Sequence, residues 1–381
     1  LNPNIVPYSH NGNFTVPAYE KLSVDGSGAN TTIGNLSEFD KFYGPLLNGS
    51  AFKNCFRKNV PLSSFYLPFY EQWPCDIKKG YTLDQQADSV DIRNDFTSDY
   101  KNGWTNAVHG FGKYLKEKGY NKTTFQVYLN NKYIMSDTVF WCLDEPMYRD
   151  DYVCIQMFND MTREAFKDSD PPVTADFRID LSRIECARNT LNKTDLVVMA
   201  QGNIREYYPL LVNLNRKYIP KRDGQKQAVW VYGGTSKPEE SASINRGFVL
   251  SSYFLGAEGI LPWQSYGTKE SWNSTASAEL AIFYPAWEYW NYNGAYGSLR
   301  MKSFRDGQQD AEYLNILMNK VGNDATRTDL KNALDKIISL ESNVVKKDEL
   351  DAGRVYFKHL SPSKLETLRR TLGYNISLKS K

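Results

Sequence analysis

The sequence predicts an α/β protein, built as a (β/α)8 barrel of the TIM type with a C-terminal helical extension. Short runs rich in β-branched and aromatic residues alternate with longer segments of helical periodicity, which is typical of parallel strands joined by crossover helices. The length of 381 residues fits one large barrel with additions. A composition of 41% hydrophobic and 24% charged residues is that of a globular protein. We place the barrel in residues 1–322 and the extension in residues 323–381.

Eight runs are predicted to be strands because they are short, apolar or β-branched, and bounded by turn residues. They cover residues 4–8, 61–70, 124–129, 138–143, 173–179, 195–200, 228–232 and 259–263. Seven other segments carry apolar residues at helical spacing. These predicted helices cover residues 36–52, 98–118, 149–166, 181–192, 205–217, 241–255 and 299–321. Together they nearly complete a (β/α)8 barrel.

One connection does not fit this pattern, because only residues 130–137 separate the third run from the fourth. A crossover between parallel strands needs about a dozen residues or more. Either the fourth run is a loop that continues the preceding strand, with the first barrel strand upstream of Leu1, or one assignment is wrong. We favour the missing first strand, because the chain begins abruptly in strand-like sequence without the pattern of a signal peptide. We therefore expect a longer precursor.

Charge and ligand-forming residues argue against several classes of protein. The 46 Lys and Arg are balanced by 44 Asp and Glu, for a net charge of +2, whereas nucleic-acid binding relies on a basic surplus. No apolar run reaches the roughly 18 residues of a membrane span. Five Cys form no CxxC pair and three His show no ligand spacing, so we expect neither a His or Cys metal centre nor a cofactor. Phosphate-loop, dinucleotide-binding and nucleophile-elbow motifs are also lacking.

Asn-x-Ser/Thr sequons favour an extracytoplasmic or secreted protein. They lie at Asn13, Asn30, Asn35, Asn48, Asn121, Asn192, Asn273 and Asn375. Cys55 and Cys75 flank one predicted strand and could pair in such a compartment, although buried free thiols are the interpretation we favour.

Aromatic residues are abundant, since 26 Tyr, 19 Phe and 8 Trp form 14% of the chain. Large flat side chains can build a core. Many of them, however, lie among polar residues, as in Tyr-Trp-Asn-Tyr-Asn at 289–293. This pattern suits stacking on sugar rings and favours a carbohydrate ligand.

The sharpest local feature is Val-Phe-Trp-Cys-Leu-Asp-Glu-Pro at 139–146, where an apolar strand-like run ends in Asp144 and Glu145. Adjacent carboxylates repel each other and lose hydration when buried, so packing alone does not explain them. Pro146 favours an extended Glu145, and a bend at the strand end would bring both acids into one pocket at the carboxyl rim of a barrel, where active sites lie. The alternative is a chance pair, as we interpret the acids at 348–349. Spacing alone leaves both interpretations open.

Three segments together resemble the catalytic domain of glycoside hydrolase family 123 and its uncharacterised relatives. They are Leu-Asp-Glu-Pro at 143–146, Gly-Ala-Glu-Gly-Ile-Leu-Pro-Trp at 256–263 and Ser-Leu-Arg-Met-Lys-Ser-Phe-Arg-Asp-Gly-Gln-Gln-Asp-Ala-Glu-Tyr-Leu at 298–314. The resemblance covers residues 65–317, and the helix motif is its most specific part. Residues 125–137 are more similar to the uncharacterised relatives, and the β-sandwich usual at the family's N-terminus is missing, so the identity of the sugar does not transfer.

The resemblance implies a β-N-acetylhexosaminidase of the N-acetylgalactosaminidase type that acts on an oligosaccharide or glycoconjugate by substrate-assisted catalysis. It assigns Glu145 as the general acid that protonates the glycosidic oxygen and then as the base for water. It assigns Asp144 as the acceptor of a hydrogen bond from the substrate's 2-acetamido N–H, which directs the acetamido carbonyl oxygen to the anomeric carbon. Two other functions stay open: a hexosidase on the same barrel that pairs Glu145 with a carboxylate such as Glu71, and a non-catalytic carbohydrate-binding barrel.

Residues at or just past the predicted strand ends are candidates for substrate binding. They are Tyr70, Trp73, Asn130, Asn131, Arg183, Gln201, Tyr232, Trp263 and Gln264. Tyr232 is favoured because the glycines after it let backbone approach a ligand, whereas Trp263 is nearly as compatible with core filling. Arg183 falls in the first turn of a predicted helix, where a solvated surface charge is the alternative. We expect Arg305 and Asp310 to belong to a structural salt-bridge cluster.

Overall fold

The computed structural model describes residues 24–67, 69, 71, 75–80, 91–129, 143–167, 174–183, 187, 194–200, 227–268, 270–273, 281–286, 294–321 and 361–379. The chain divides into two compact units. The first comprises residues 1–197 and 218–227, and the second comprises residues 198–217 and 228–381. The boundary at 322 between a barrel and a helical extension stays a prediction.

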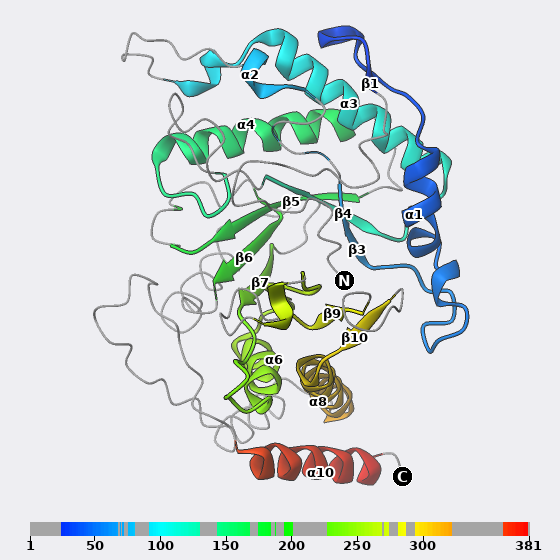
Figure 1. Cartoon of the computed structure of the whole chain (residues 1–381), viewed down its shortest axis with the longest axis vertical. Coiled ribbons are helices and arrows are strands. Elements are labelled where there is room, and N and C mark those ends of the chain that lie inside the picture. The colour runs from blue at the N-terminus through cyan, green and yellow to red at the C-terminus, as the bar shows by residue number, and fades with distance from the viewer. Residues whose placement is uncertain are drawn as a thin grey trace. The chain divides into compact units, whose positions relative to one another are not determined.

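The largest sheet has six strands, which follow one another in chain order as β3-β4-β5-β6-β7-β8 (Figure 1). They are β3 (Ser64–Tyr66), β4 (Thr124–Tyr128), β5 (Thr174–Leu181), β6 (Leu196–Ala200), β7 (Ala228–Gly233) and β8 (Gly259–Pro262). The strands are parallel in the pairs β3 with β4, β4 with β5, and β7 with β8. With helices between the strands, the fold is of the α/β class, as the sequence predicted.

Each of these six strands coincides with a predicted one. The other two predicted strands lie outside the described residues, at 4–8 and 138–143, except for Leu143, which is buried and not in a strand. The predicted helix at 205–217 also lies outside them. The described residues therefore form a six-stranded sheet, and a closed barrel of eight strands is not confirmed.

The predicted helix at 181–192 is wrong wherever the structure describes it. Leu181 is the last residue of β5, and neither Arg183 nor Ala187 is helical. Alternate apolar residues of β5 stay buried as far as Leu181, which has no exposed surface. Because this period of two belongs to a strand, pairing in the sheet outweighs local helix propensity here.

Aromatic side chains form much of the core of the first unit. Helix α3 (Ser98–Glu117) buries Trp104, Val108 and Phe111 along one face. Helix α4 (Arg149–Phe166) has the predicted bounds. It places Phe158 edge-on against Trp104, with ring centroids 5.3 Å apart.

Helix α1 (Ser37–Leu47) ends before the predicted residue 52, and the short 3-10 helix η3 (Ser50–Phe52) follows it. Gly49, with a φ of 86°, separates the two, because a left-handed glycine ends a helix. The smaller elements of the first unit are β1 (Val24–Asp25), η2 (Gly28–Asn30), β2 (Thr32–Ile33), α2 (Ile77–Gly80) and η4 (Ile92–Asp95).

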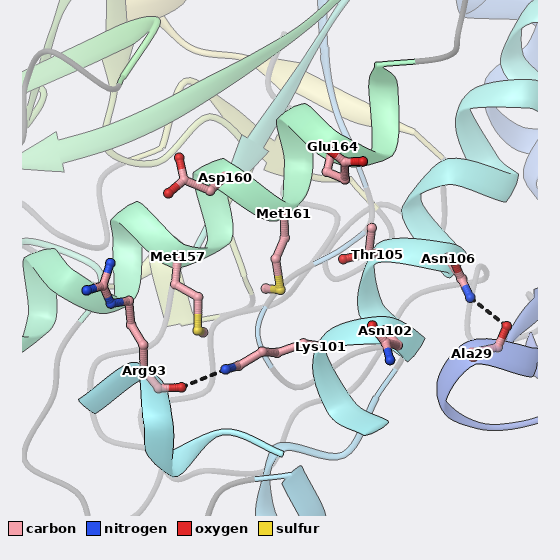
Figure 2. Close-up of a pocket in the computed structure, with 10 residues that line it drawn as sticks. All are labelled: Ala29, Arg93, Lys101, Asn102, Thr105, Asn106, Met157, Asp160, Met161 and Glu164. Carbon is pink, nitrogen blue, oxygen red and sulfur yellow. Dashed lines mark hydrogen bonds between the residues drawn. The ribbon is translucent and has the colours of Figure 1, made fainter. Parts of the chain in front are cut away.

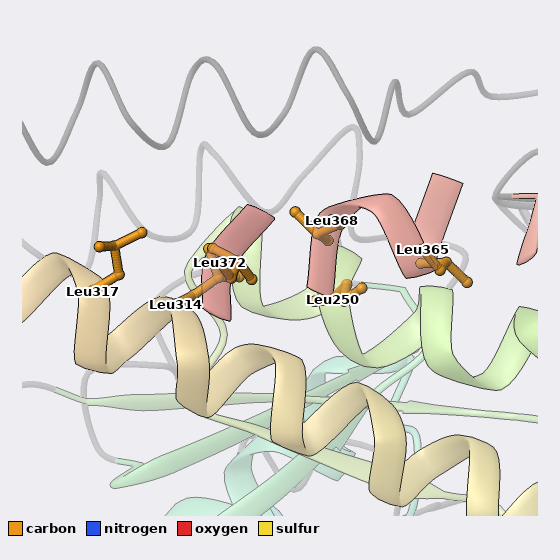
Figure 3. Packing of buried hydrophobic residues seen from close by; sticks show 6 residues of the cluster. All are labelled: Leu250, Leu314, Leu317, Leu365, Leu368 and Leu372. Atoms are coloured by element: carbon orange, nitrogen blue, oxygen red, sulfur yellow. The ribbon is translucent and has the colours of Figure 1, made fainter. Parts of the chain in front are cut away.

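Three helices of the second unit pack around a leucine cluster (Figure 3). They are α6 (Ser243–Leu255), α8 (Leu299–Val321), which has the predicted bounds, and α10 (Pro362–Leu378). Each contributes to the cluster, which contains Leu250, Leu314, Leu317, Leu365, Leu368 and Leu372. The described part of this unit also contains η9 (Glu270–Trp272) and an antiparallel pair, β9 (Phe283–Pro285) with β10 (Ala295–Gly297).

An ionic cluster lies beside these leucines. Asp310 on α8 has no exposed surface and accepts hydrogen bonds from Arg246 Nε and Arg369 Nε, each at 2.6 Å. Arg246 also donates to Glu366 at 2.9 Å, so the cluster joins α6, α8 and α10. The predicted structural role is confirmed for Asp310. Arg305 is 57% exposed and lies at the edge of the cluster, because its partner Asp306, at 3.9 Å, also pairs with Arg369, at 3.6 Å.

Three cysteines are free thiols in the part of the chain that the structure describes: Cys55, Cys75 and Cys154. The expected burial holds for Cys154, whereas Cys75 is half-buried. It is wrong for Cys55, which lies on an exposed loop after η3. Among the described helices, none combines the length and the apolarity that a bilayer crossing requires.

Candidate active site

The carboxyl ends of β3, β4 and β5 lie at one edge of the sheet, because these strands are parallel neighbours. Acidic side chains of the first unit gather there, and we call Glu71, Asp144, Glu145 and Asp180 the carboxylate cluster. The charge of Asp144 acts on Glu71, and the charge of Glu145 acts on Asp180. The predicted acid pair therefore lies among further carboxyl groups of neighbouring strand ends.

Backbone conformation explains how adjacent acids enter one site. Asp144 is buried, at 8% exposure, and Glu145 is half-buried. Glu145 has a φ of 58°, in the left-handed region that few non-glycine residues adopt. This corrects the expectation that Pro146 would hold Glu145 extended. A left-handed residue interrupts the alternation of an extended chain, so the two side chains need not face opposite ways.

The segment after the acid pair is anchored to α4. Tyr152 donates its hydroxyl hydrogen bond to the carbonyl of Pro146 at 3.0 Å. The carboxylate of Asp151 accepts from the amides of Met147 and Tyr148, at 3.0 and 2.8 Å. An acid at this position satisfies amide groups at the start of the helix. The turn that carries Glu145 is thereby fixed on its C-terminal side.

Tyr128, at the end of β4, connects the members of the cluster. Its hydroxyl donates a hydrogen bond to Asp144 Oδ1 at 2.6 Å. The guanidinium of Arg178 lies 4.2 Å from the centroid of the Tyr128 ring, and Arg178 Nε donates to Asp180 at 2.6 Å. Stacking and pairing therefore hold the tyrosine, and through it Asp144, in one orientation.

Asp180 is a paired but perturbed carboxyl group. Burial raises the pKa of Asp180 above its ordinary value, although Arg178 opposes the rise, and the nearby Glu145 adds to it. Its ion pair with Arg178 is itself buried, with side-chain exposures of 9% and 2%. Asp180 is thus occupied by Arg178 and is a poor candidate for a free nucleophile.

Glu71 is the most unusual member of the cluster. It has no exposed surface, and neither carboxyl oxygen has a hydrogen-bond partner in the described part of the chain. Burial raises the pKa of Glu71 to about 8, with the charge of Asp144 adding to the rise. Its backbone carbonyl accepts a hydrogen bond from the Tyr100 hydroxyl, which fixes the main chain there. Glu71 is therefore a neutral acid at neutral pH.

Three aromatic residues lie at or after the ends of β7 and β8 in the second unit, and we call Tyr232, Trp263 and Tyr266 the aromatic platform. Tyr232 is half-buried within β7. The rings of Tyr232 and Trp263 are 6.4 Å apart at an interplanar angle of 40°. Trp263 and Tyr266 are 45% and 41% exposed. Core filling therefore does not account for Trp263. Gln264 is half-buried, and its amide donates to the Tyr266 carbonyl at 3.4 Å.

Arg183 follows β5 directly and is not in a helix. Its guanidinium contacts the sulfur of Met147 at 2.9 Å, and Met147 comes two residues after Glu145. Arg183 is thus near the segment of the acid pair, as a binding role requires. Five other predicted binding residues lie outside the described residues: Tyr70, Trp73, Asn130, Asn131 and Gln201.

Sequence reasoning did not find Tyr128, Arg178, Asp180 or Tyr266. A usable signal exists for one pair, because Arg178 and Asp180 are charged residues two positions apart, on the polar face of a strand whose other face is apolar. No group of three or more His, Cys, Asp or Glu suited to hold a metal ion occurs among the residues that the structure describes.

A hollow of about 490 Å³ also lies in the first unit, over α3 and α4 (Figure 2). The buried Met157 and Met161 line it from α4, and Lys101 lies across from them, donating to the Arg93 carbonyl at 2.7 Å. The full lining is Ala29, Arg93, Lys101, Asn102, Thr105, Asn106, Met157, Asp160, Met161 and Glu164. None of these belongs to the carboxylate cluster, so the hollow is separate from the candidate active site.

No protein-family model matches the sequence, and no curated protein matches it. Among solved structures, the chain is similar to a family 123 glycoside hydrolase from Clostridium perfringens, analysed for glycolipid glycan hydrolysis. The TM-score is 0.44 and the sequence identity is 16%, and the similarity covers 74% of this chain and 45% of that chain. The chain thus spans less than half the length of that enzyme, which belongs to the family that the three sequence segments resemble.

Proposed function

We propose that the chain is a glycoside hydrolase whose general acid is Glu145 and whose orienting carboxylate is Asp144. The observation that carries the proposal is the 2.6 Å hydrogen bond from Tyr128 to Asp144, next to the left-handed turn at Glu145. A half-buried acid beside a fixed, buried carboxylate is an arrangement that serves acid and base chemistry. The three sequence segments add the reaction class.

We further propose a β-N-acetylhexosaminidase mechanism in which the substrate supplies the nucleophile. Glu145 gives its proton to the glycosidic oxygen while the acetamido carbonyl oxygen bonds to the anomeric carbon and the glycosidic bond breaks. Asp144 accepts a hydrogen bond from the acetamido N–H and stabilises the positive charge of the cyclic intermediate. Glu145 then removes a proton from water, whose oxygen attacks the anomeric carbon. This attack breaks the bond between the acetamido oxygen and the anomeric carbon, and the product keeps the anomeric configuration of the substrate.

The state of the other carboxyl groups supports substrate assistance over a direct carboxylate nucleophile. Glu71 keeps its proton up to about pH 8, and a protonated carboxyl is neither a base nor a good nucleophile. Asp180 is held by Arg178. A hexosidase that pairs Glu145 with Glu71 is therefore the weaker alternative within the enzyme class.

The aromatic platform supports a sugar ligand, because its exposed rings, those of Trp263 and Tyr266, offer flat apolar surface. It serves a non-catalytic carbohydrate-binding protein equally well, and only turnover separates the two functions. An N-acetylgalactosamine specificity, an extracytoplasmic location and a closed eight-stranded barrel belong to the same proposal and rest on the sequence.

The decisive experiment compares turnover by the wild type, Glu145→Gln and Asp144→Asn on aryl β-N-acetylgalactosaminides and β-N-acetylglucosaminides. Glu145→Gln should lower kcat/KM by roughly a hundred- to ten-thousandfold. The loss should be smaller with a dinitrophenyl leaving group, which needs little protonation. Asp144→Asn should lower turnover with every leaving group, because it acts on the acetamido group. Glu117→Gln, an exposed glutamate of α3, is the matched control and should be unchanged.

The alternatives give different results in the same assays. Turnover of aryl β-hexosides that lack the acetamido group, abolished by Glu71→Gln, would support two-carboxylate catalysis and contradict substrate assistance. Oligosaccharide binding without turnover in the wild type would indicate the binding protein. Unchanged turnover in Glu145→Gln would refute the proposal.

A further inference from the structure

One loop of the first unit projects aromatic and basic side chains without packing them. Residues 51–60, which we call the 51–60 loop, are exposed except for Phe52, which is half-buried. Phe56 is fully exposed, at 103%. Basic side chains surround it in the sequence, at Lys53, Arg57 and Lys58, and no acidic residue occurs from 51 to 70.

Internal contacts hold this loop in shape. The guanidinium of Arg57 donates to the carbonyls of Val60 and Pro61 and lies 4.9 Å from the centroid of the Phe52 ring. Main-chain hydrogen bonds join Cys55 N to the Phe52 carbonyl and Lys58 N to the Cys55 carbonyl, at 3.2 and 3.1 Å. Phe56 is therefore presented outward by an ordered turn.

The turn also contains backbone strain, although it packs no residue of the loop into the core. Lys58 and Asn59 are consecutive non-glycine residues in the left-handed region, with φ of 47° and 69°, and each such residue costs free energy. At Gly49 an added Cβ would lie 1.9 Å from the Asn59 carbonyl oxygen. The close approach of Gly49 thus depends on the absence of a side chain, and the strained turn stabilises no buried residue of the loop.

We propose that the 51–60 loop is an attachment site for a bilayer surface that carries anionic lipids. The ring of Phe56 enters the interfacial region of the bilayer, where aromatic side chains are favoured. The positive charges of Lys53, Arg57 and Lys58 then lie among anionic headgroups. The proposal concerns a surface outside the carboxylate cluster and does not depend on the proposed hydrolase activity.

The form of the loop favours a bilayer over a protein partner. A single ring that projects with its whole surface exposed offers no extended patch, whereas stable protein interfaces bury a broad, complementary surface. A fluid lipid interface adapts to one inserted side chain, and the basic residues next to Phe56 in the sequence, in a segment without acidic residues, match its anionic headgroups. One ring and three charges predict weak, reversible attachment that weakens as salt screens the charges.

The test is sedimentation of the full chain, kept reduced, with vesicles of phosphatidylcholine alone or with about 30% phosphatidylserine. The wild type should bind the phosphatidylserine vesicles more strongly and lose binding as salt is raised. Phe56→Ser should lower the partition coefficient about ten- to a hundredfold, and Phe56→Trp should restore it. Lys53→Glu with Lys58→Glu should lower it about thirtyfold or more.

Matched controls change the same chemistry elsewhere. Tyr374→Ser removes a 65% exposed aromatic ring of α10, and Lys113→Glu with Lys116→Glu reverses two exposed charges of α3; both should bind like the wild type. Equal binding of Phe56→Ser and wild type, equal binding to both kinds of vesicle, or no vesicle binding by the wild type would each overturn the proposal. The last result would point to a protein partner for this loop.

Discussion

Three carboxyl groups among the described residues have no exposed surface, and two of them, Asp310 and Glu71, have opposite surroundings. Asp310 in the second unit accepts hydrogen bonds from two guanidinium groups, those of Arg246 and Arg369, each at 2.6 Å. Glu71 in the first unit has no hydrogen-bond partner for either oxygen among the described residues. The same chemical group is therefore paired in one region and left alone in the other.

The difference shows what each carboxyl group can do. Burial by itself would lower the pKa of Arg246, but its hydrogen bonds with Asp310 and Glu366 raise the pKa overall, so Arg246 stays charged. The ionic cluster joins three helices. Glu71 stays neutral because burial and the charge of Asp144 raise its pKa to about 8. A paired buried charge is compatible with a structural role, whereas an unpaired acid costs stability and lies where chemistry is proposed.

Removing the charge of Asp310 is expected to have the largest effect on stability. Asp310→Asn leaves the buried guanidinium of Arg246 and the partly exposed one of Arg369 without a full counter-charge, and such a break in a buried pair costs about 3–5 kcal/mol. Urea unfolding followed by circular dichroism should show the loss in the transition of the second unit. Arg305→Gln, at a 57% exposed position of the same helix, should change stability by less than about 0.5 kcal/mol. Equal unfolding of Asp310→Asn and wild type would show that the ionic cluster is not structural.

Neutralising Glu71 is expected to act in the opposite direction. The unfolded chain loses the Glu71 proton near its ordinary pKa of 4.5, whereas the folded chain keeps it up to about pH 8. Between these values the folded state binds more protons, so this residue lowers stability as pH rises. Glu71→Gln removes that dependence and should be more stable than the wild type at pH 8, by about 4 kcal/mol.

Urea midpoints at pH 5 and pH 8 measure this difference. The stabilities of the variant and the wild type should differ least at pH 5, where the wild-type carboxyl is protonated in the folded state and mostly, but not fully, ionised in the unfolded state. If the stability difference between Glu71→Gln and the wild type is the same at pH 5 and pH 8, the pKa of Glu71 is not raised and its contrast with Asp310 is wrong.

Local patterns were sufficient to predict the six strands and the acid pair. Runs such as Leu-Val-Val-Met-Ala at 196–200 are strands because both faces of a parallel sheet are buried. Asp144 and Glu145 were visible because two acids directly after an apolar run conflict with packing. Residues 181–183 misled the prediction, since Leu181 is the last residue of β5 and completes its buried alternation.

The rest of the candidate site depends on contacts between distant residues. Tyr128 and Asp144 are joined by a hydrogen bond, but nothing in either segment specifies its partner. Arg178 and Asp180 contradict the rule that charged residues are exposed, and their mutual ion pair and the contact of Arg178 with the Tyr128 ring offset the cost of their burial. The left-handed Glu145 also opposes the extended preference set by Pro146.

Tyr128→Phe removes one hydrogen bond from the carboxylate cluster and tests whether that bond serves catalysis or only the fold. Asp144 would lose the hydroxyl that orients it, and we expect kcat to fall about tenfold on aryl β-N-acetylhexosaminides, with a smaller change in KM. Tyr120→Phe is a close control, because Tyr120 donates to Asp40 at 2.9 Å in the same unit without touching the cluster. Both variants should lose about 1 kcal/mol of stability. Equal kinetics in the two variants would show that the Tyr128 bond serves only the fold.

The smallest expected effect concerns the aromatic platform. Trp263 is 45% exposed, so its removal leaves little cavity in the core. Trp263→Ala should therefore raise KM about fivefold while kcat and stability change little, because a stacking contact worth about 1 kcal/mol holds substrate and transition state alike. Tyr296→Ala, at a 44% exposed position of β10, is the control for losing an exposed ring. Steady-state kinetics and urea unfolding of both variants measure these effects. A fall in kcat with KM unchanged would show that Trp263 acts in the chemical step. A loss of stability above about 2 kcal/mol would show that Trp263 is part of the core.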